Sequence, residues 1–327
     1  MLVRPNDKLN PMYIDYYFQS DIYRNRVQIL ASGVNINNIR ADYITESKIP
    51  FPPLAEQQRI VDRIESLFAK LDEAKEKAQA VVDSFETRKA AILHRAFTGE
   101  LTKRWRQEND LETGAWTLVP LEKAFTIRSG TTIPTEDELD SGRIPYVKVA
   151  DMNLPENLIQ ITTSSRFVNE CPDSHAIPYG STIFPKRGGA ILTNKKRFVG
   201  VEEIIADLNT MAIIPRKDIV LDWYGYYWMQ SVDLREINNG SNVPQINNKD
   251  MVKLKLPIPD LREQAEIVRI FNSLFEKEQQ VTETAEAVLA QIDTMKKAIL
   301  ARAFRGKLRT NNLTEESAVE LVKSVLN

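Results

Sequence analysis

The chain has 327 residues, enough for two average domains or for one domain together with long helices. It carries 43 Lys and Arg against 45 Asp and Glu, a net charge of −2, so only a local cluster of cations could argue for nucleic-acid binding. The hydrophobic fraction of 43% supports a substantial core and excludes a disordered chain. The single cysteine, Cys171, excludes an internal disulfide framework and a multi-cysteine zinc site.

Signals for membranes, cofactors and catalysis are missing from the sequence. No apolar run reaches the roughly 20 residues of a membrane span, and the N-terminus lacks a signal-peptide core, so we expect a cytoplasmic protein without a membrane partner. The glycine patterns of nucleotide-binding loops and the N-P-P-[YF] motif of amino-methyltransferases are absent. His94 is interpreted as a surface position of a helix, and a reactive thiol at Cys171, near His175, is disfavoured. We expect no cofactor, no metal and no catalytic residue.

An internal repeat is the strongest feature of the sequence. Residues 49–71 (IPFPPLAEQQRIVDRIESLFAKL) resemble residues 256–278 (LPIPDLREQAEIVRIFNSLFEKE), and residues 87–101 resemble residues 294–308, at a constant offset of 207 positions. Weaker similarity continues upstream, where YYFQS ending at Ser20 aligns with YWMQS ending at Ser231. The repeat is too long for a solenoid, whose units span about 20–50 residues, so it indicates duplication of a whole domain with its helix.

The first copy of the repeat is shorter than the second. About a hundred residues, from 114 to 210, have no counterpart before Met1. We therefore expect five regions: a C-terminal remnant of a first globular unit at 1–48, a first helical segment at 49–110, a complete globular unit at 111–255, a second helical segment at 256–310, and a tail at 311–327.

Both helical segments have the pattern of a coiled coil, with apolar residues at alternating three- and four-residue steps. Prolines precede each segment, and Gly99 and Gly306 mark the ends. We expect an antiparallel pair; the alternative is that each helix packs on its own domain. Charges of both signs balance along the first helix, which predicts a solvated spacer and not a DNA-binding face. The residues predicted to pair are Val61, Ile64, Phe68, Leu71, Phe85, Ile92, Val268, Phe271, Phe275, Leu289, Ile292 and Ile299.

The segment between the helices, residues 116–250, is rich in β-branched residues interrupted by turn formers. Strands are expected within residues 144–152, 180–192, 196–206 and 210–215, and a helix at 222–238. The predicted fold class is therefore α+β, a mixed α/β globular domain combined with two long helices that form an antiparallel coiled coil.

A basic stretch lies inside this globular segment. Residues 183–200 contain five cations and no acidic residue, next to the flexible pair Gly188 and Gly189. Lys and Arg neutralise DNA phosphates, whereas Arg, Asn and Gln read base edges. The alternative is a solvated loop whose charge is offset by the acidic run 136–140. The candidate DNA-binding residues are Lys186, Arg187, Lys195, Lys196 and Arg197, with Asn194 as base reader and Arg128 and Lys148 in support.

The repeated blocks give the chain a resemblance to the DNA-specificity subunit of type I restriction–modification systems. The residues that carry it are IPFPPLAEQQRIV (49–61) and LPIPDLREQAEIV (256–268), each followed by a long helix ending in A-I-L-x-R-A-F-x-G-x-L. Within the globular segment, residues 116–121, 142–152, 180–189 and 209–215 are similar to landmarks of target-recognition domains.

The resemblance implies two target-recognition domains, each reading half of a bipartite site in double-stranded DNA. The helices between them would set the spacing and dock two methyltransferase subunits, and an ATP-dependent restriction subunit would join through the complex. The subunit itself would not be catalytic. Because the first domain is incomplete, self-association of two chains is one expected arrangement. The main alternative is a truncated coiled-coil regulatory half-subunit without productive DNA binding. A self-contained nuclease or methyltransferase is least favoured.

Overall fold

The computed structural model describes residues 5–31, 48–111, 116–170, 172–238, 240 and 243–311. The chain divides into two compact units. Unit 1 comprises Met1–Phe85 and Gln279–Asn327, and unit 2 comprises Glu86–Glu278. No described helix is both long and apolar enough to cross a membrane. The helices are α1 (Pro11–Gln19), α2 (Asp21–Ala31), α4 (Leu54–Asp83), α5 (Phe85–Phe97), α6 (Lys103–Glu108), α7 (Leu121–Ala124), α8 (Asp222–Ser231), α9 (Leu234–Ile237), α10 (Asn248–Met251) and α11 (Leu261–Ala303).

Unit 2 contains a five-stranded and a four-stranded sheet, as well as a two-stranded ladder. In the five-stranded sheet, of order β2-β10-β7-β8-β4, strand β10 is antiparallel to both of its neighbours, β2 and β7. The four-stranded sheet, of order β5-β3-β9-β6, contains one parallel pair, β3 with β9. The strands are β2 (Phe125–Ser129), β3 (Ile144–Val147), β4 (Gln160–Ile161), β5 (Phe167–Val168), β6 (Ile177–Pro178), β7 (Thr182–Pro185), β8 (Arg197–Val199), β9 (Glu203–Ala206) and β10 (Thr210–Pro215).

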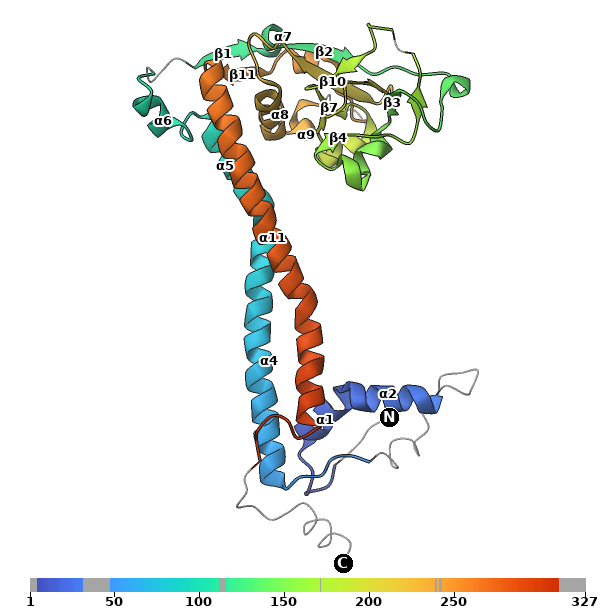
Figure 1. Cartoon of the computed structure of the whole chain (residues 1–327), viewed down its shortest axis with the longest axis vertical. Coiled ribbons are helices and arrows are strands. Elements are labelled where there is room, and N and C mark those ends of the chain that lie inside the picture. The colour runs from blue at the N-terminus through green and yellow to red at the C-terminus, as the bar shows by residue number, and fades with distance from the viewer. Residues whose placement is uncertain are drawn as a thin grey trace, which may run out of the picture. The chain divides into compact units, whose positions relative to one another are not determined.

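Alternating side chains of the five-stranded sheet enter two different cores, as the period of a strand requires. Phe184 of β7 and Phe198 of β8 pack in one core with residues of α8, which lies on that face of the sheet (Figure 1). Their neighbours Ile183 and Val199 pack on the opposite face, with residues of the four-stranded sheet. Unit 2 is thus layered as helix, sheet and sheet, which confirms the α+β class expected from the sequence.

The ladder of β1 (Thr117–Pro120) and β11 (Lys255–Ile258) joins the two ends of the globular segment. Beside it lies a buried ion pair between Arg106 of α6 and Glu263 of α11. The Glu263 carboxylate also accepts hydrogen bonds from Thr102 Oγ1 and, at 3.0 Å, from Trp116 Nε1. Arg106 Nη2 donates to the Gly99 carbonyl at 2.6 Å. This network connects the segment after α5, the start of the sheet domain and the first turn of α11.

In unit 1, α4 packs against the C-terminal part of α11 (Figure 1). Ile64 of α4 shares a core with Leu300, and two turns further along α4 Asp72 lies 2.6 Å from Lys296 Nζ. Partners further along α4 therefore lie earlier on α11. This is the antiparallel pairing expected from the heptads.

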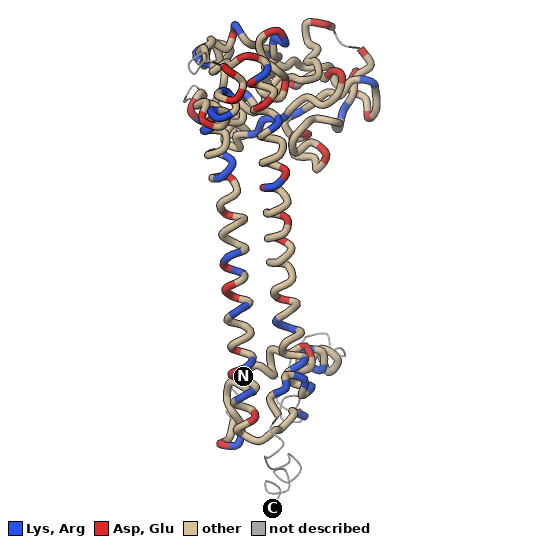
Figure 2. The backbone as a smooth tube through the Cα atoms, turned by 60° about the vertical axis from the view of Figure 1, so that its left-hand side comes forward, with Lys and Arg blue, Asp and Glu red and all other residues tan. Residues whose placement is uncertain are grey.

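In unit 2, α5 packs against the N-terminal part of α11, and this pairing is also antiparallel. Arg88 Nε lies 2.7 Å from Glu278 Oε2, whereas Phe97, later on α5, contacts Phe271, earlier on α11. Basic and acidic positions are interspersed along the long helices (Figure 2). The distribution agrees with the charge balance read from the sequence.

Two helices expected to be continuous are interrupted. The first long helix is divided into α4 and α5 at Ser84, whose hydroxyl donates to the Ala80 carbonyl at 2.6 Å and so competes with the helical backbone bonds. The helix expected at 222–238 is divided into α8 and α9, because Asp233 caps α9 by accepting from the Arg235 amide. Heptad spacing alone contains neither signal.

Parts of the expected strands are short 3-10 helices. The strand expected at 144–152 continues as η2 (Val149–Asn153), and the one at 180–192 continues as η4 (Gly188–Thr193). The strand expected at 210–215 is confirmed as β10. The other 3-10 helices are η1 (Thr135–Asp137) and η3 (Pro155–Asn157).

The two copies of the sequence repeat share the same hydrogen bonds around one glutamine each, Gln57 in the first copy and Gln264 in the second. Gln57 Oε1 accepts from the amide of Asn10, which precedes α1, at 2.8 Å, and Gln264 Oε1 accepts from the amide of Leu221, which precedes α8, at 2.9 Å. Each Nε2 donates to the carbonyl of a proline five residues earlier, at 2.9 Å for Gln57 and 3.0 Å for Gln264. A tyrosine completes each copy: Tyr13 and Tyr224 donate to the carbonyls of Pro50 and Pro257.

The paired glutamines explain why the E-Q block recurs in the sequence. We expect Gln264→Leu to lower the free energy of unfolding by about 2–4 kcal/mol, because it leaves one amide and two carbonyls without partners in a site with no solvent access. Gln57→Leu should behave alike in unit 1. Urea unfolding measures both, and Gln291→Leu, an exposed glutamine of α11, is the matched control. Wild-type stability in Gln264→Leu would contradict this reading.

Candidate nucleic-acid interface

The cations of the basic stretch lie in two places in unit 2. Lys186 and Arg187 directly follow β7, at the edge of the sheet where β10 begins. The Lys186 amide donates to the Asn209 carbonyl at 2.8 Å, and Arg187 forms an isolated bridge with Gln245. Gly188, with φ of +72°, has the left-handed conformation that favours glycine, and a Cβ added there would meet nothing within 4 Å. The space beside the Gly188 Cα is therefore open to a ligand, whereas its amide already donates to the Pro244 carbonyl at 2.8 Å.

A buried carboxylate lies beside these cations. Asp207 accepts a hydrogen bond from Asn209 Nδ2 at 3.0 Å, and its second carboxylate oxygen has no partner among the described residues. Burial raises the pKa of Asp207, whereas the charge of Lys148 lowers it. Burial lowers the pKa of Lys186, as does the charge of Arg187 next to it. Positive charge thus gathers at this edge of the sheet, around one carboxylate.

The supporting cations are engaged in different ways. Lys148 Nζ lies 2.6 Å from Glu138 Oε2 and 5.2 Å from the ring centre of Tyr146. Arg166 pairs with Asp140, so the acidic run 136–140 binds cations of its own neighbourhood. Arg128 lies on β2, half-buried, opposite Ala212 of β10. A phosphate would have to displace Glu138 to reach Lys148.

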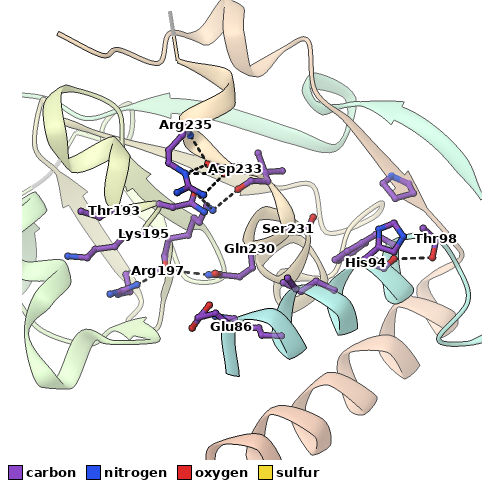
Figure 3. A pocket seen from close by; sticks show the side chains of 18 of the residues that line it. Glu86, His94, Thr98, Thr193, Lys195, Arg197, Gln230, Ser231, Asp233 and Arg235 are labelled. Carbon is purple, nitrogen blue, oxygen red and sulfur yellow. Dashed lines mark hydrogen bonds and ion pairs between the residues drawn. The ribbon is translucent and has the colours of Figure 1, made fainter. Parts of the chain in front are cut away.

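The second group is Lys195, which lies between η4 and β8, and Arg197, the first residue of β8. Lys195 Nζ is exposed and bonds Asn153, and Arg197 Nε donates to the Met152 carbonyl at 3.1 Å. Both side chains face a groove, with Gln230 and Glu86 on other parts of its wall (Figure 3). Burial lowers the pKa of Arg197. Asn153 and Met152 were missed from the sequence, because only the fold brings this distant turn to the basic stretch.

Two of the predicted contacts are internal supports of this segment. Lys196 is 1% exposed, and its Nζ donates to Asn194 Oδ1 at 2.7 Å and to the Val232 carbonyl at 2.6 Å. Asn194 has a left-handed φ of 52°, and its Oδ1 also accepts from the Leu234 amide at 2.9 Å. In this conformation Lys196 cannot reach a phosphate, and the carbonyl of Asn194 is already occupied. The structure corrects the sequence reading here: both residues hold the segment against the junction of α8 and α9.

The buried ammonium of Lys196 predicts a pH dependence of stability. Burial, with smaller contributions from the charges of Lys89 and Arg235, lowers its pKa from 10.5 to about 7, although Asp233 opposes the shift. The unfolded chain therefore binds more protons between these values, so stability should rise as the pH increases from about 7 to about 10.5. Urea midpoints across this range should show that slope, and Lys196→Met should flatten it. An unchanged slope in Lys196→Met would exclude this lysine as its source.

The residues predicted to pair the helices are all at least half-buried. Val61, Ile64, Phe271 and Ile292 are buried, and the other eight predicted positions are partly covered. Other buried positions lie off the seam, where the helices meet α1 or α8; these are Ile60, Leu93, Ile267 and Leu300. Heptad arithmetic missed them because they face a third element.

Two further sequence predictions have simple outcomes. His94 lies exposed on α5, as expected for a surface position. Cys171 lies outside the described residues, so the prediction of an unreactive thiol stays a prediction.

Comparison with known proteins identifies a family. The profile of the type I restriction modification DNA specificity domain matches residues 1–82 and 114–291. The chain is 27% identical to the EcoKI specificity subunit of Escherichia coli (strain K12), over 94% of this chain and 68% of that protein. It is 25% identical to the StySPI specificity subunit of Salmonella potsdam, over 94% of this chain and 67% of that protein. The chain thus spans about two thirds of the length of these relatives.

Solved structures share the fold. A chain from a structural study of type I R-M complex assembly superposes with a TM-score of 0.71 at 19% identity, covering 94% of this chain and 74% of the other. The HsdS subunit of Thermoanaerobacter tengcongensis gives a TM-score of 0.66 at 19% identity, covering 92% of this chain and 72% of the other.

Proposed function

Because the chain belongs to the type I restriction modification DNA specificity family, we propose that it is the non-catalytic subunit that recognises DNA and assembles with methylase and restriction subunits. The single observation that carries this proposal is the family match, which spans the repeated E-Q blocks and the sheet domain of unit 2. The names of the relatives, which are specificity subunits, support the same role.

Unit 2 is the part proposed to read DNA. Its sheet domain, with the proposed boundaries 111–255, would read one half-site in a double-stranded target. Support comes from Lys186 and Arg187 at an edge with open space beside Gly188, and from Lys195 and Arg197 on the neighbouring segment. These four cations are the proposed contacts. Lys196, at 1% exposure, is enclosed by protein, whereas Lys186, at 8%, lies two residues before Gly188, beside which there is open space. Sequence-independent affinity for phosphates and local base reading would both arise here.

The helices are the part proposed to bind methyltransferase subunits. In unit 1 the start of α4 packs against the end of α11, and in unit 2 the end of α5 packs against the start of α11. A helix that carries a tyrosine packs against each pair: α1 with Tyr13 in unit 1, and α8 with Tyr224 in unit 2. The matching glutamine networks give the two units similar surfaces at these places. Similar surfaces would bind similar partners, so two copies of one methyltransferase subunit fit this arrangement. The restriction subunit would join through that complex.

Mass measurement of the reconstituted complex tests the assembly. We expect a complex of this chain with methyltransferase subunits, containing either one chain or two self-associated chains. The same sample is then titrated with duplex DNA. A chain that neither assembles nor binds DNA contradicts the proposal. Assembly without any DNA binding would favour the alternative, a coiled-coil regulatory half-subunit.

A further inference from the structure

A polar groove of about 900 Å³ lies within unit 2 between α5 and the basic segment. One wall is α5, which contributes Glu86, Lys89 and His94. The opposite wall is the segment 193–197 together with the junction of α8 and α9, residues 230–235. Figure 3 shows Lys195 and Arg197 on one side and Glu86 and His94 on α5.

Cations outnumber acids along this groove. Lys89, Lys195, Arg197 and Arg235 line it, and the buried Lys196 lies beneath. The acidic residues are Glu86 and Asp233. The Asp233 carboxylate is already held by the Arg235 guanidinium at 2.6 Å, and a further Arg235 bond reaches the same group at 2.9 Å. Because Asp233 is paired, Glu86 is the acidic lining residue that is left to face the cations of both walls.

The positive charges of the two walls act on each other. The charges of Lys89 and Arg235 both disfavour the protonated form of Lys196, in addition to its burial. Lys89 belongs to α5 and Lys196 to the opposite wall, so cations from both sides share one electrostatic environment. A polyanion in the groove would relieve this repulsion, because each phosphate adds negative charge between the walls.

We infer that this groove holds backbone phosphates of a DNA duplex, and that α5, through Lys89, forms the second wall of the DNA-binding surface of unit 2. The inference rests on the proposed function and extends it to a helix that the sequence predicted to be only a solvated spacer. Charge complementarity selects nucleic acid as the occupant: cations outnumber acidic residues among the charged lining residues, and these cations come from both walls. Lys89 is thus assigned to a phosphate contact that carries no sequence information.

The test is a salt series on the chain assembled with its methyltransferase, with a mixed-sequence duplex as probe. Lys89→Gln should weaken binding several-fold for all sequences alike and reduce the salt slope by about one unit. Glu86→Gln, which removes the acidic side chain facing the cations, should strengthen binding. Arg95→Gln is the matched control, since Arg95 is an exposed cation of α5 that does not line the groove. It should change neither quantity.

The outcomes separate this inference from the proposed function. If Lys195→Ala with Arg197→Ala weakens binding while Lys89→Gln keeps wild-type affinity and salt slope, α5 is no phosphate wall and the inference fails alone. If none of these changes affects binding, the proposed DNA-binding face is wrong as well. If Lys89→Gln releases the methyltransferase, measured by mass, and leaves the salt slope unchanged, the groove holds a protein and the inference is overturned.

Discussion

Replacing Lys186, Arg187, Lys195 and Arg197 together with alanine is expected to weaken binding of duplex DNA by about a thousandfold, or about 1 kcal/mol for each lost contact. The salt slope should fall by about three to four units, because each neutralised phosphate contributes about 0.9. Arg187 is exposed at the sheet edge, and Lys195 and Arg197 line the groove. Lys186 is 8% exposed and lies two residues before Gly188, whereas Lys196 is 1% exposed. The measurement is fluorescence anisotropy of the complex assembled with methyltransferase, across a salt series.

The control removes the same number of charges elsewhere in unit 2, at Lys123, Lys249, Lys253 and Arg262. This variant should bind as tightly as wild type, because those side chains lie outside both cation groups. Single alanine variants then separate phosphate contacts from base contacts: the first weaken all duplexes alike, and the second cost about 1–3 kcal/mol at one position of the site. Unchanged affinity and slope in the fourfold variant would refute this surface.

Arg106→Met is expected to lower the free energy of unfolding of unit 2 by about 3–5 kcal/mol, the typical result of removing one partner of a buried ion pair. The Glu263 carboxylate would stay buried with Thr102 and Trp116 as its hydrogen-bond donors, without a compensating charge. The Gly99 carbonyl would also lose its guanidinium donor. Urea unfolding followed by tryptophan fluorescence measures the effect, because Trp116 contacts both partners.

Two further variants show whether the uncompensated charge is the cause. Adding Glu263→Gln to Arg106→Met should recover part of the lost stability, since the neutral amide has a smaller desolvation cost. Arg104→Met removes an exposed pair with Glu108 on the same short helix and should leave unfolding unchanged. A double variant less stable than Arg106→Met would contradict the electrostatic explanation.

Several features of this protein follow from its sequence alone. The repeat at a constant offset identified two equivalent helix starts, and the structure shows that Gln57 and Gln264 make matching bonds. Heptad periodicity identified the helices and their antiparallel sense, and Gly99 and Gly306 marked their ends, both with positive φ. These features are local or periodic, so a single chain carries their signal directly. The family resemblance rested on the same blocks.

Only the tertiary structure decided which of the neighbouring cations are buried and which line the groove. In sequence Lys195, Lys196 and Arg197 are equivalent neighbours, yet Lys196 is buried under the α8–α9 junction while the other two line a groove. Its buried position depends on acceptors at Asn194 and Val232, and Val232 lies far along the chain. Composition and spacing contain no information on which strand or helix will cover a given side chain.

The contribution of α5 to the wall of the groove was likewise hidden from the sequence. A balanced count of charges along the helix predicted a solvated spacer, but folding sorts those charges by direction, and Lys89 faces the basic segment while Arg95 does not line the groove. The ladder of β1 and β11, which pairs Thr117 with Ile258, closes the sheet domain next to this helix. Periodicity in the sequence predicts which face of a helix is buried. What lies opposite the exposed face depends on contacts between segments that are distant in sequence, and those contacts form only when the chain folds.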